Sequence, residues 1–430
     1  MKQTLSRSFS LMAVFSLTMV HGGCQKSNPS RESEGSDQIS LDLDDVLAHQ
    51  GRERIFYTDS SSNLSFVYDL QERKVVLTVP FEGLARVYTG ALGQYGYLVE
   101  AEYDRITIVD SGLRFVQESG TWVEQNIKPF VSEAKISGLA PTHFVAHDSR
   151  VAIFFDNEGK ARILDEQSLV SPSILFNEIQ TTTPHHGVAV PFGSYVLATW
   201  AQTPPTGGRP IASGVSVFTD RGIDTGLRFE GCPSLHGEVQ VNTSILFGCR
   251  DGLLIITLDD SGWGVRKVSN PSGSPEGSRV GTLTAGRTPT EVIGNFGRQQ
   301  LVLFDIKEES WKTIGLPAAY AQFQYDEASK LILVLGRDGF FYGIDPLTSS
   351  VQVKFDLGFA ADGANHGAGD PQMVIGQQAI YLTLPHRGEI AMLERSTLTE
   401  RERIQVGGEP TKIALLTSHR SRLGAKVWTQ

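Results

Sequence analysis

The sequence LVLFD at residues 301–305 is a short apolar run that closes on an acid, and it decides the fold because the chain carries this pattern eight times. The other copies read FVYD (66–69), ITIVD (106–110), RILD (162–165), VFTD (217–220), IITLD (255–259), YGID (342–345) and AMLE (391–394). Their acids lie 39 to 55 residues apart. A repeat period in the forties with strand-like units is typical of a β-propeller.

Each acid is preceded by a tight turn and another apolar run, which together predict a β-hairpin. LFGCRDG at 246–252 and LVLGRDG at 333–339 are near copies of one such hairpin. A further short strand lies upstream of most hairpins, as at 144–146. The predicted unit therefore has four strands, A to D from the centre outward, and the acid closes strand C.

The two ends of the chain complete one unit. The first unit lacks strand A, because residues 54–57 already match strand B, while residues 412–416 form an unclaimed strand at the C-terminus. Joining the two closes the ring and removes the exposed edges of a linear array. We predict an all-β fold, an eight-bladed β-propeller over residues 51–430, with seven blades as the alternative.

Residues 1–23 have the features of an export signal. Lys2 and Arg7 precede an apolar run at 9–20 that is too short to span a bilayer. The run ends in HGGC (21–24), which resembles a bacterial lipoprotein cleavage box and makes Cys24 the predicted lipidation site; an ordinary secretion signal is the alternative. The Ser-, Glu- and Asp-rich residues 24–50 predict a flexible acidic tether. We therefore expect an exported protein, attached to a bacterial membrane by lipid only, on its periplasmic or cell-surface side.

Composition and charge restrict the function. The chain of 430 residues is 40% hydrophobic and 20% charged, as soluble globular proteins are, and its net charge of −10 argues against a nucleic-acid partner. Once Cys24 is assigned to the anchor, Cys232 and Cys249 remain. In an oxidising compartment such an even pair predicts a disulfide.

Histidines recur at one position of the repeat. Counting back from the strand-C acids locates the start of strand A, and three consecutive units hold His143, His186 and His236 there, the second after allowance for an inserted loop at 202–212. The equivalent positions of other units hold Arg86, Val280, Tyr320 and Met373. Because strand A is the innermost strand, three adjacent blades are expected to direct three imidazoles into one volume.

Three imidazoles from separate rigid elements are what a tetrahedral zinc site requires, and they leave one position for a fourth ligand. The loop ADGANH (361–366) offers His366 or Asp362 for that position, and His185 is a further possible ligand. Copper(II) or nickel would accept the same ligands. The alternative without a metal is a set of polar rim residues that bond to water or backbone.

Several motifs resemble the AztD-type periplasmic zinc metallochaperones: HHGVAVP (185–191), CPSLHGE (232–238), VAIFFD (151–156) and ADGANH (361–366). This resemblance implies a β-propeller that binds zinc and passes it to the solute-binding protein of a zinc ABC transporter. It implies that His186, His236 and His366 belong to the zinc site, and it admits His143. The chain departs from the family in the acidic N-terminal segment, which holds one histidine, His49, where relatives are often His-rich.

The sequence thus predicts a non-catalytic, exported protein that stores or delivers Zn²⁺. Complete ligation by the protein would leave no metal-bound water to activate, unlike in a catalytic zinc site. A metal-dependent propeller hydrolase is one alternative, although HExxH and GxSxG motifs are absent from the sequence. A metal-free surface scaffold that binds protein through its loops is the other.

Overall fold

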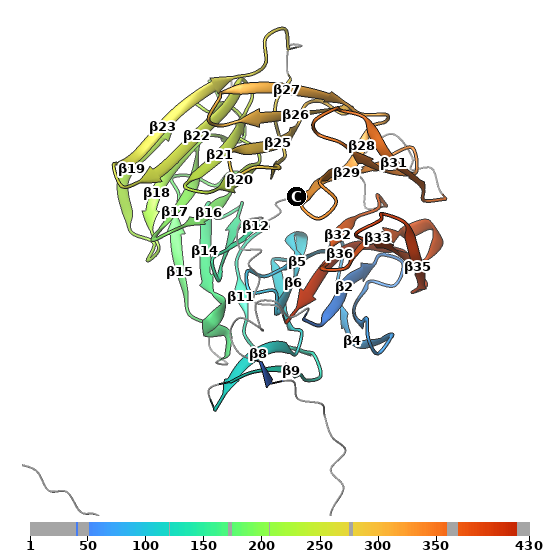
Figure 1. Cartoon of the computed structure of the whole chain (residues 1–430). Helices are drawn as coiled ribbons and strands as arrows, with labels where there is room; N and C mark the ends of the chain where they lie inside the picture. Colours follow the sequence, from blue (N-terminus) through green and yellow to red (C-terminus); the bar gives the residue numbers. More distant parts are fainter. Residues whose placement is uncertain are drawn as a thin grey trace, which may run out of the picture. The chain divides into compact units, whose positions relative to one another are not determined.

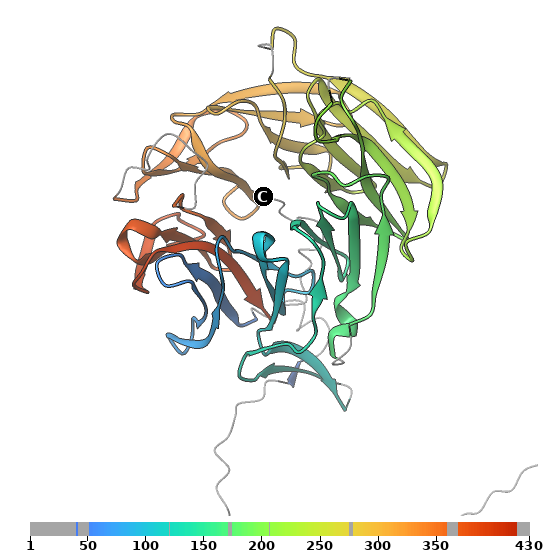
Figure 2. The same cartoon turned by 180° about the vertical axis from the view of Figure 1, so that it is seen from behind.

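Eight antiparallel sheets follow one another in a ring, in chain order (Figure 1), and the view from behind shows the same arrangement (Figure 2). This computed structural model describes residues 40–41, 51–119, 121–170, 174–205, 207–274, 278–358 and 369–418. The predicted eight-bladed β-propeller is confirmed, and the seven-bladed alternative is wrong. No helix in the described ranges has the length and apolar character needed to cross a membrane.

Blades 1 to 4 each begin with an innermost strand at the centre of the ring and continue outward. Blade 1 contains β36 (Pro410–Thr417), β2 (Glu53–Asp59), β3 (Leu64–Asp69) and β4 (Lys74–Pro80). Blade 2 contains β5 (Arg86–Thr89), β6 (Tyr95–Glu100), β7 (Arg105–Asp110) and the short β10 (Phe130–Val131) and β11 (Ile136–Ser137). Blade 3 contains β12 (Pro141–His147), β13 (Arg150–Phe155), β14 (Lys160–Asp165) and β15 (Phe176–Gln180). Blade 4 contains β16 (Ala189–Phe192), β17 (Tyr195–Gln202), β18 (Ile211–Thr219) and β19 (Asp224–Glu230).

Blades 5 to 8 repeat the four-strand pattern. Blade 5 contains β20 (Glu238–Val241), β21 (Ser244–Cys249), β22 (Gly252–Asp259) and β23 (Gly262–Ser269). Blade 6 contains β24 (Leu283–Ala285), β25 (Glu291–Asn295), β26 (Gln300–Asp305) and β27 (Ser310–Gly315). Blade 7 contains β28 (Tyr320–Asp326), β29 (Leu331–Gly336), β30 (Phe340–Ile344) and β31 (Val351–Asp356). Blade 8 contains β32 (Met373–Ile375), β33 (Ala379–Leu384), β34 (Glu389–Glu394) and β35 (Glu400–Gln405).

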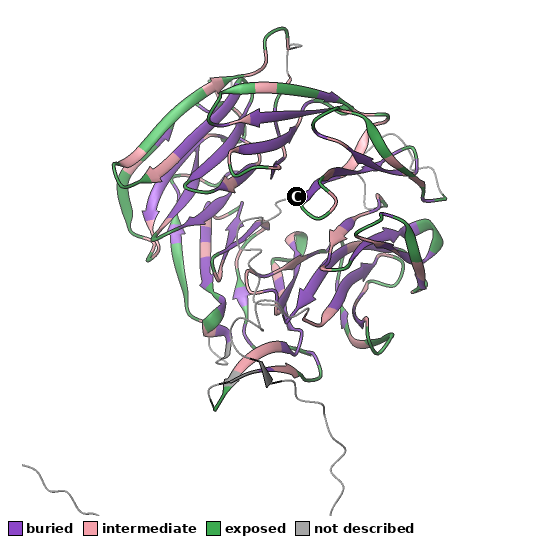
Figure 3. Cartoon of the chain, in the orientation of Figure 1, coloured by how far each residue is buried: buried purple, intermediate pink, exposed green. Residues whose placement is uncertain are grey.

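Burial falls from the inner strands to the outer strand of each blade (Figure 3). Every residue of β6, β21 and β33 is buried, whereas β4 and β27 are mostly exposed. Eight clusters of buried apolar side chains lie between neighbouring blades, one at each of the eight contacts around the ring. Burial of these faces on both sides of a blade is the main favourable contribution to folding.

The repeated acid has a local structural role at the end of strand C. The carboxylate of Asp69 accepts the backbone N–H groups of Gln71 and Glu72, at 3.0 and 2.9 Å. Asp305 makes the same pair of bonds to Lys307 and Glu308. An aspartate that bonds the backbone two residues ahead forms an Asx turn. The acid therefore recurs because it starts the turn from strand C to strand D.

The ring closes as predicted, because β36 of the C-terminus pairs with β2 in blade 1. In this register Glu53 lies opposite Thr417, at the end of strand A, and Asp59 lies opposite Pro410, where strand A begins. We call the face where the A strands begin the A-start face, and the opposite one the A-end face. The backbone N–H of Arg52 donates to the hydroxyl of Ser418 at 2.9 Å, so both ends of the propeller meet at the A-end face.

Blade 2 departs from the predicted repeat. Its outer strand is replaced by β10 and β11, and the chain between β7 and β10 forms a separate hairpin, β8 (Leu113–Glu118) and β9 (Thr121–Asn126), which β1 (Ser40–Leu41) joins. The buried Arg54 holds this hairpin against blade 1, because it bonds to Asp69, to the backbone oxygens of Ser111 and Ile127 and to the side chain of Asn126. The predicted signal sequence, Cys24 and, apart from β1, the predicted tether lie outside the described residues.

Candidate metal site

The three histidines at the repeated position lie in consecutive blades on the A-start face. His143 is the third residue of β12, while His186 and His236 lie in the loops that lead into β16 and β20. Their side chains meet. Nε2 of His143 lies 3.0 Å from Nε2 of His186, and the three ring centroids are 4.6, 6.0 and 6.1 Å apart.

Two of these rings are oriented by hydrogen bonds on their outer nitrogen. His186 directs Nδ1 at Oδ2 of Asp156, 2.7 Å away, and His236 directs Nδ1 at the backbone oxygen of Gly281, also 2.7 Å away. With Nδ1 donating, each ring keeps its lone pair on Nε2. Carboxylate and carbonyl partners of this kind are the ones that orient metal-binding histidines in proteins.

The loop of His186 depends on a residue without a side chain. A Cβ atom on Gly187 would lie 2.6 Å or less from Thr199, His185 and Phe154. The backbone nitrogen of Gly187 lies 3.4 Å from Oδ1 of Asp156. The Asp156 carboxylate therefore contacts both His186 and Gly187. Glycine at this position lets the loop approach blade 3 closely enough for His186 to reach His143.

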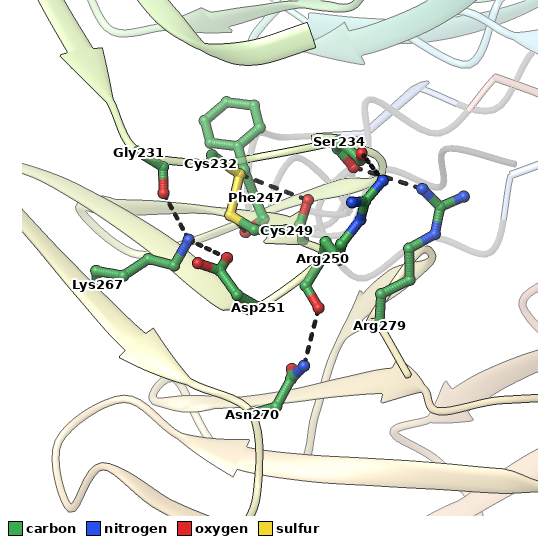
Figure 4. Close-up of a disulfide and its surroundings, with 11 residues drawn as sticks. Gly231, Cys232, Ser234, Phe247, Cys249, Arg250, Asp251, Lys267, Asn270 and Arg279 are labelled. Carbon is green, nitrogen blue, oxygen red and sulfur yellow. Dashed lines mark hydrogen bonds and ion pairs between the residues drawn. A yellow bond between two sulfur atoms is a disulfide. The ribbon is translucent and has the colours of Figure 1, made fainter. Parts of the chain in front are cut away.

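The loop of His236 is held by a disulfide (Figure 4) and by backbone hydrogen bonds. The predicted bond between Cys232 and Cys249 is confirmed, and both cysteines are fully buried. The backbone N–H of His236 donates to the backbone oxygen of Gly248 at 2.9 Å, and the N–H of Gly248 donates to the backbone oxygen of Gly237 at 3.0 Å. The segment that presents His236 is thus fastened to the B–C turn of its own blade.

The environment favours the neutral form of His143 and of His236. Burial, together with the neighbouring charges of His186, His236 and Arg86, holds the pKa of His143 well below its usual value. Burial also lowers the pKa of His236, and the nearby Arg279 acts in the same direction, against the Gly281 hydrogen bond. Neutral imidazole is the form that binds a metal ion.

The separation between His143 and His186 suits two neighbouring ligands of a tetrahedral ion. Zinc–nitrogen bonds of 2.0–2.1 Å place neighbouring ligand nitrogens about 3.3 Å apart, close to the separation between His143 and His186. Within the described part of the chain, no group of three or more His, Cys, Asp or Glu side chains is arranged so that it could hold a metal ion as it stands. The predicted fourth ligands, His366 and Asp362, lie outside the described residues.

His185 is not brought into the cluster. It is fully buried, its Nδ1 lies 2.7 Å from the oxygen of Thr183, and its Nε2 lies 2.9 Å from the hydroxyl of Thr199. Phe154 packs against its ring. Both ring nitrogens are occupied, so His185 supports the turn that carries its neighbour.

Sequence reasoning missed three parts of the site. Asp156 lies in the B–C turn of blade 3 yet serves a histidine of blade 4, and Arg209 lies 3.3 Å from the same carboxylate oxygen. The carbonyl of Gly281 has no signal in the sequence, because every residue carries one. Asp156 could have been found from the sequence, because it lies in a B–C turn on the face where the histidines were expected.

Fold and side chains together define an eight-bladed β-propeller that gathers three imidazoles at the inner ends of three adjacent blades. No protein-family model matches the chain. In sequence the chain is 26% identical over 366 residues to the zinc chaperone AztD of Citrobacter koseri, an alignment that covers 84% of this chain and 85% of the relative.

Solved structures show the same likeness. The crystal structure of Citrobacter koseri AztD matches with a TM-score of 0.76 at 24% identity, over 85% of this chain and 98% of that one. The apo form of that protein gives a TM-score of 0.74 over the same shares of the two chains. The predicted resemblance to AztD-type zinc chaperones is confirmed.

The fold alone does not separate binding proteins from enzymes. The dihydro-heme d1 dehydrogenase NirN matches with a TM-score of 0.57 at 12% identity, over 91% of this chain and 83% of that one. Function must therefore be inferred from the histidine cluster.

Proposed function

We propose that this protein binds one Zn²⁺ through His143, His186 and His236 and delivers it without catalysing a reaction. The observation that carries the proposal is the convergence of three imidazoles, two of them oriented from behind by Asp156 and Gly281. The name of the similar protein, a zinc chaperone, supports zinc as the metal and delivery as the role.

The proposal includes the fourth ligand and the partner. His366 or Asp362 would complete the coordination sphere, leaving no water for catalysis. The recipient would be the solute-binding protein of a zinc ABC transporter, as the family resemblance implies. Residues 1–23 would direct export, with lipid on Cys24, and the buried Cys232–Cys249 disulfide fits an oxidising compartment.

The test is zinc binding by the untagged protein, measured by competition with a chelator of known affinity. We expect about one tightly bound zinc in the wild type and none in the variant that combines His186→Ala and His236→Ala. His147→Ala is the matched control, because His147 lies at the other end of β12, where its Nδ1 is 2.8 Å from Asp148. Unchanged zinc stoichiometry in the double variant would sink the proposal.

The same preparations separate the alternatives. A metal-free scaffold predicts no bound zinc in the wild type. A metal-dependent hydrolase predicts turnover of ester or lactone substrates that is lost together with zinc. Transfer of zinc to the isolated solute-binding protein, without any such turnover, is the outcome that delivery requires.

A further inference from the structure

The inserted loop of blade 4 reaches Asp156, the carboxylate that orients His186. It lies between β17 and β18, which are 8 and 9 residues long and are offset by an irregularity between Trp200 and Ala201. The N–H of Gly207 donates to the oxygen of Pro204 at 2.8 Å, which forms a turn within the loop. These features place residues 203–205 and 207–210 at the B–C end of the blade, on the A-start face.

The base of the insertion is fastened beside His236. The oxygen of Ala212 accepts the N–H of Leu235, and the oxygen of Ser213 accepts the N–H of Cys232, both at 3.0 Å. The insertion is therefore joined to the disulfide-linked segment of blade 5. These two bonds attach the base of the insertion to the segment of blade 5 that precedes His236.

From this position Arg209 contacts the carboxylate that orients His186. Its Nη2 lies 3.3 Å from Oδ2 of Asp156, the same oxygen that accepts Nδ1 of His186 at 2.7 Å. The Asp156 side chain is 7% exposed, whereas that of Arg209 is 60% exposed. A solvent-facing cation thus shares a buried anion with a candidate zinc ligand.

The contact between Arg209 and Asp156 should change zinc affinity in a predictable direction. A carboxylate behind an imidazole raises its basicity as a metal ligand, and a guanidinium on that carboxylate offsets part of the effect. Arg209 also places a positive charge near the position of a dication. Both effects weaken zinc binding, and neither requires Arg209 to touch the metal.

We propose that Arg209 is a positioning residue that acts through Asp156 to hold the zinc affinity of the histidine cluster down and keep the ion exchangeable. The proposal rests on the proposed zinc function. It assigns a role to the inserted loop, whose Arg209 contacts the carboxylate that orients His186.

The test compares zinc affinity in Arg209→Gln, Arg209→Lys and the wild type by chelator competition. An ion pair with so exposed a partner is weak, so Arg209→Gln should tighten zinc binding by about 1.4- to fivefold. Arg209→Lys keeps the charge and should stay close to the wild type. The gain should shrink at high salt, because ions screen an exposed pair.

A double-mutant cycle tests the route through Asp156. Asp156→Asn should weaken zinc binding by about 10- to 100-fold, and Arg209→Gln should then have little further effect. Arg221→Gln is the matched control, because Arg221 is an exposed arginine in the turn after β18, at the other end of blade 4.

The outcomes separate this inference from the proposed function. A wild type that binds no zinc overturns both. A wild type that binds zinc, with an affinity that Arg209→Gln leaves unchanged, overturns only the role of Arg209. A gain that persists in full in the Asp156→Asn background overturns the route through Asp156.

Discussion

Blades 3 to 5 and blades 6 to 8 share one backbone design but use the start of strand A differently. In blades 3 to 5 this position holds the three clustered histidines. In blades 6 to 8 it holds Val280, Tyr320 and Met373, which belong to or pack against the apolar clusters between blades. The repeat fixes where a side chain lies, and the residue placed there decides whether it stabilises the fold or forms a site.

The strongest way to break this contrast is to give blade 3 the residue of blade 6. His143→Val should abolish tight zinc binding while the propeller still folds, because valine suits a strand position. The measurement is zinc affinity by chelator competition, with circular dichroism as the check on folding. Met373→Leu, a volume-conserving change at the same position in blade 8, should leave zinc affinity unchanged. Comparable losses in both variants would mean that the position acts through stability alone.

The disulfide offers a second, smaller test, because Cys232 and Cys249 fasten the histidine-bearing loop of blade 5. Replacing both by alanine opens a link across a separation of 17 residues, which should lower the free energy of unfolding by about 3 kcal/mol. Zinc affinity should fall less than in His143→Val, because the backbone bonds of His236 remain.

Chemical denaturation and zinc titration check this prediction. Both are run on the variant with two alanines and on the wild type with and without a reducing agent. The reduced wild type should behave like the alanine pair. If zinc affinity stays at the oxidised value, the backbone bonds alone position His236, and the disulfide serves only stability.

The smallest expected effect on zinc affinity is that of a substitution at Glu166, which lies at the A-end face in η2 (Glu166–Val170). Its buried carboxylate accepts the N–H of Leu92 and the hydroxyl of Tyr97, both at 2.7 Å, and burial raises its pKa to about 7. Between the unfolded value, near 4.5, and about 7 the folded state binds more protons than the unfolded state. The stabilisation is therefore complete below pH 4.5 and is lost as the pH rises through 7.

Glu166→Gln should remove this dependence, which amounts to at most about 1.4 kcal/mol per pH unit. Denaturation curves between about pH 4.5 and 8 measure it. Zinc affinity should not change, because the carboxylate lies at the face opposite the histidines. An equally steep slope in the variant would assign the dependence to another group.

The fold could be predicted because its main signal is local. Asp69 and Asp305 each organise a turn with residues two and three positions ahead, so the pattern is visible in the sequence itself. The hairpin of β8 and β9 was not predicted. It lies between two copies of the repeat and depends on Arg54, far away in sequence, to hold it in place.

The histidine cluster was predictable for the same reason, since it follows the repeat. Its supporting residues were not, because Asp156 and Arg209 come from turns of different blades and no periodicity links them. His185 shows that a neighbour in sequence need not join the site. It is next to His186 in sequence, yet its ring lies in the protein interior.

Both ends of the propeller leave from one side, where Arg52 bonds to Ser418, and the imidazoles lie on the other. Arg52 and Ser418, at the two ends of the described part of the propeller, therefore lie on the side away from the proposed zinc site. A tether that joined the propeller at residue 51 would be attached on the side opposite the imidazoles. The attachment point itself would then not obstruct an acceptor that collects the ion.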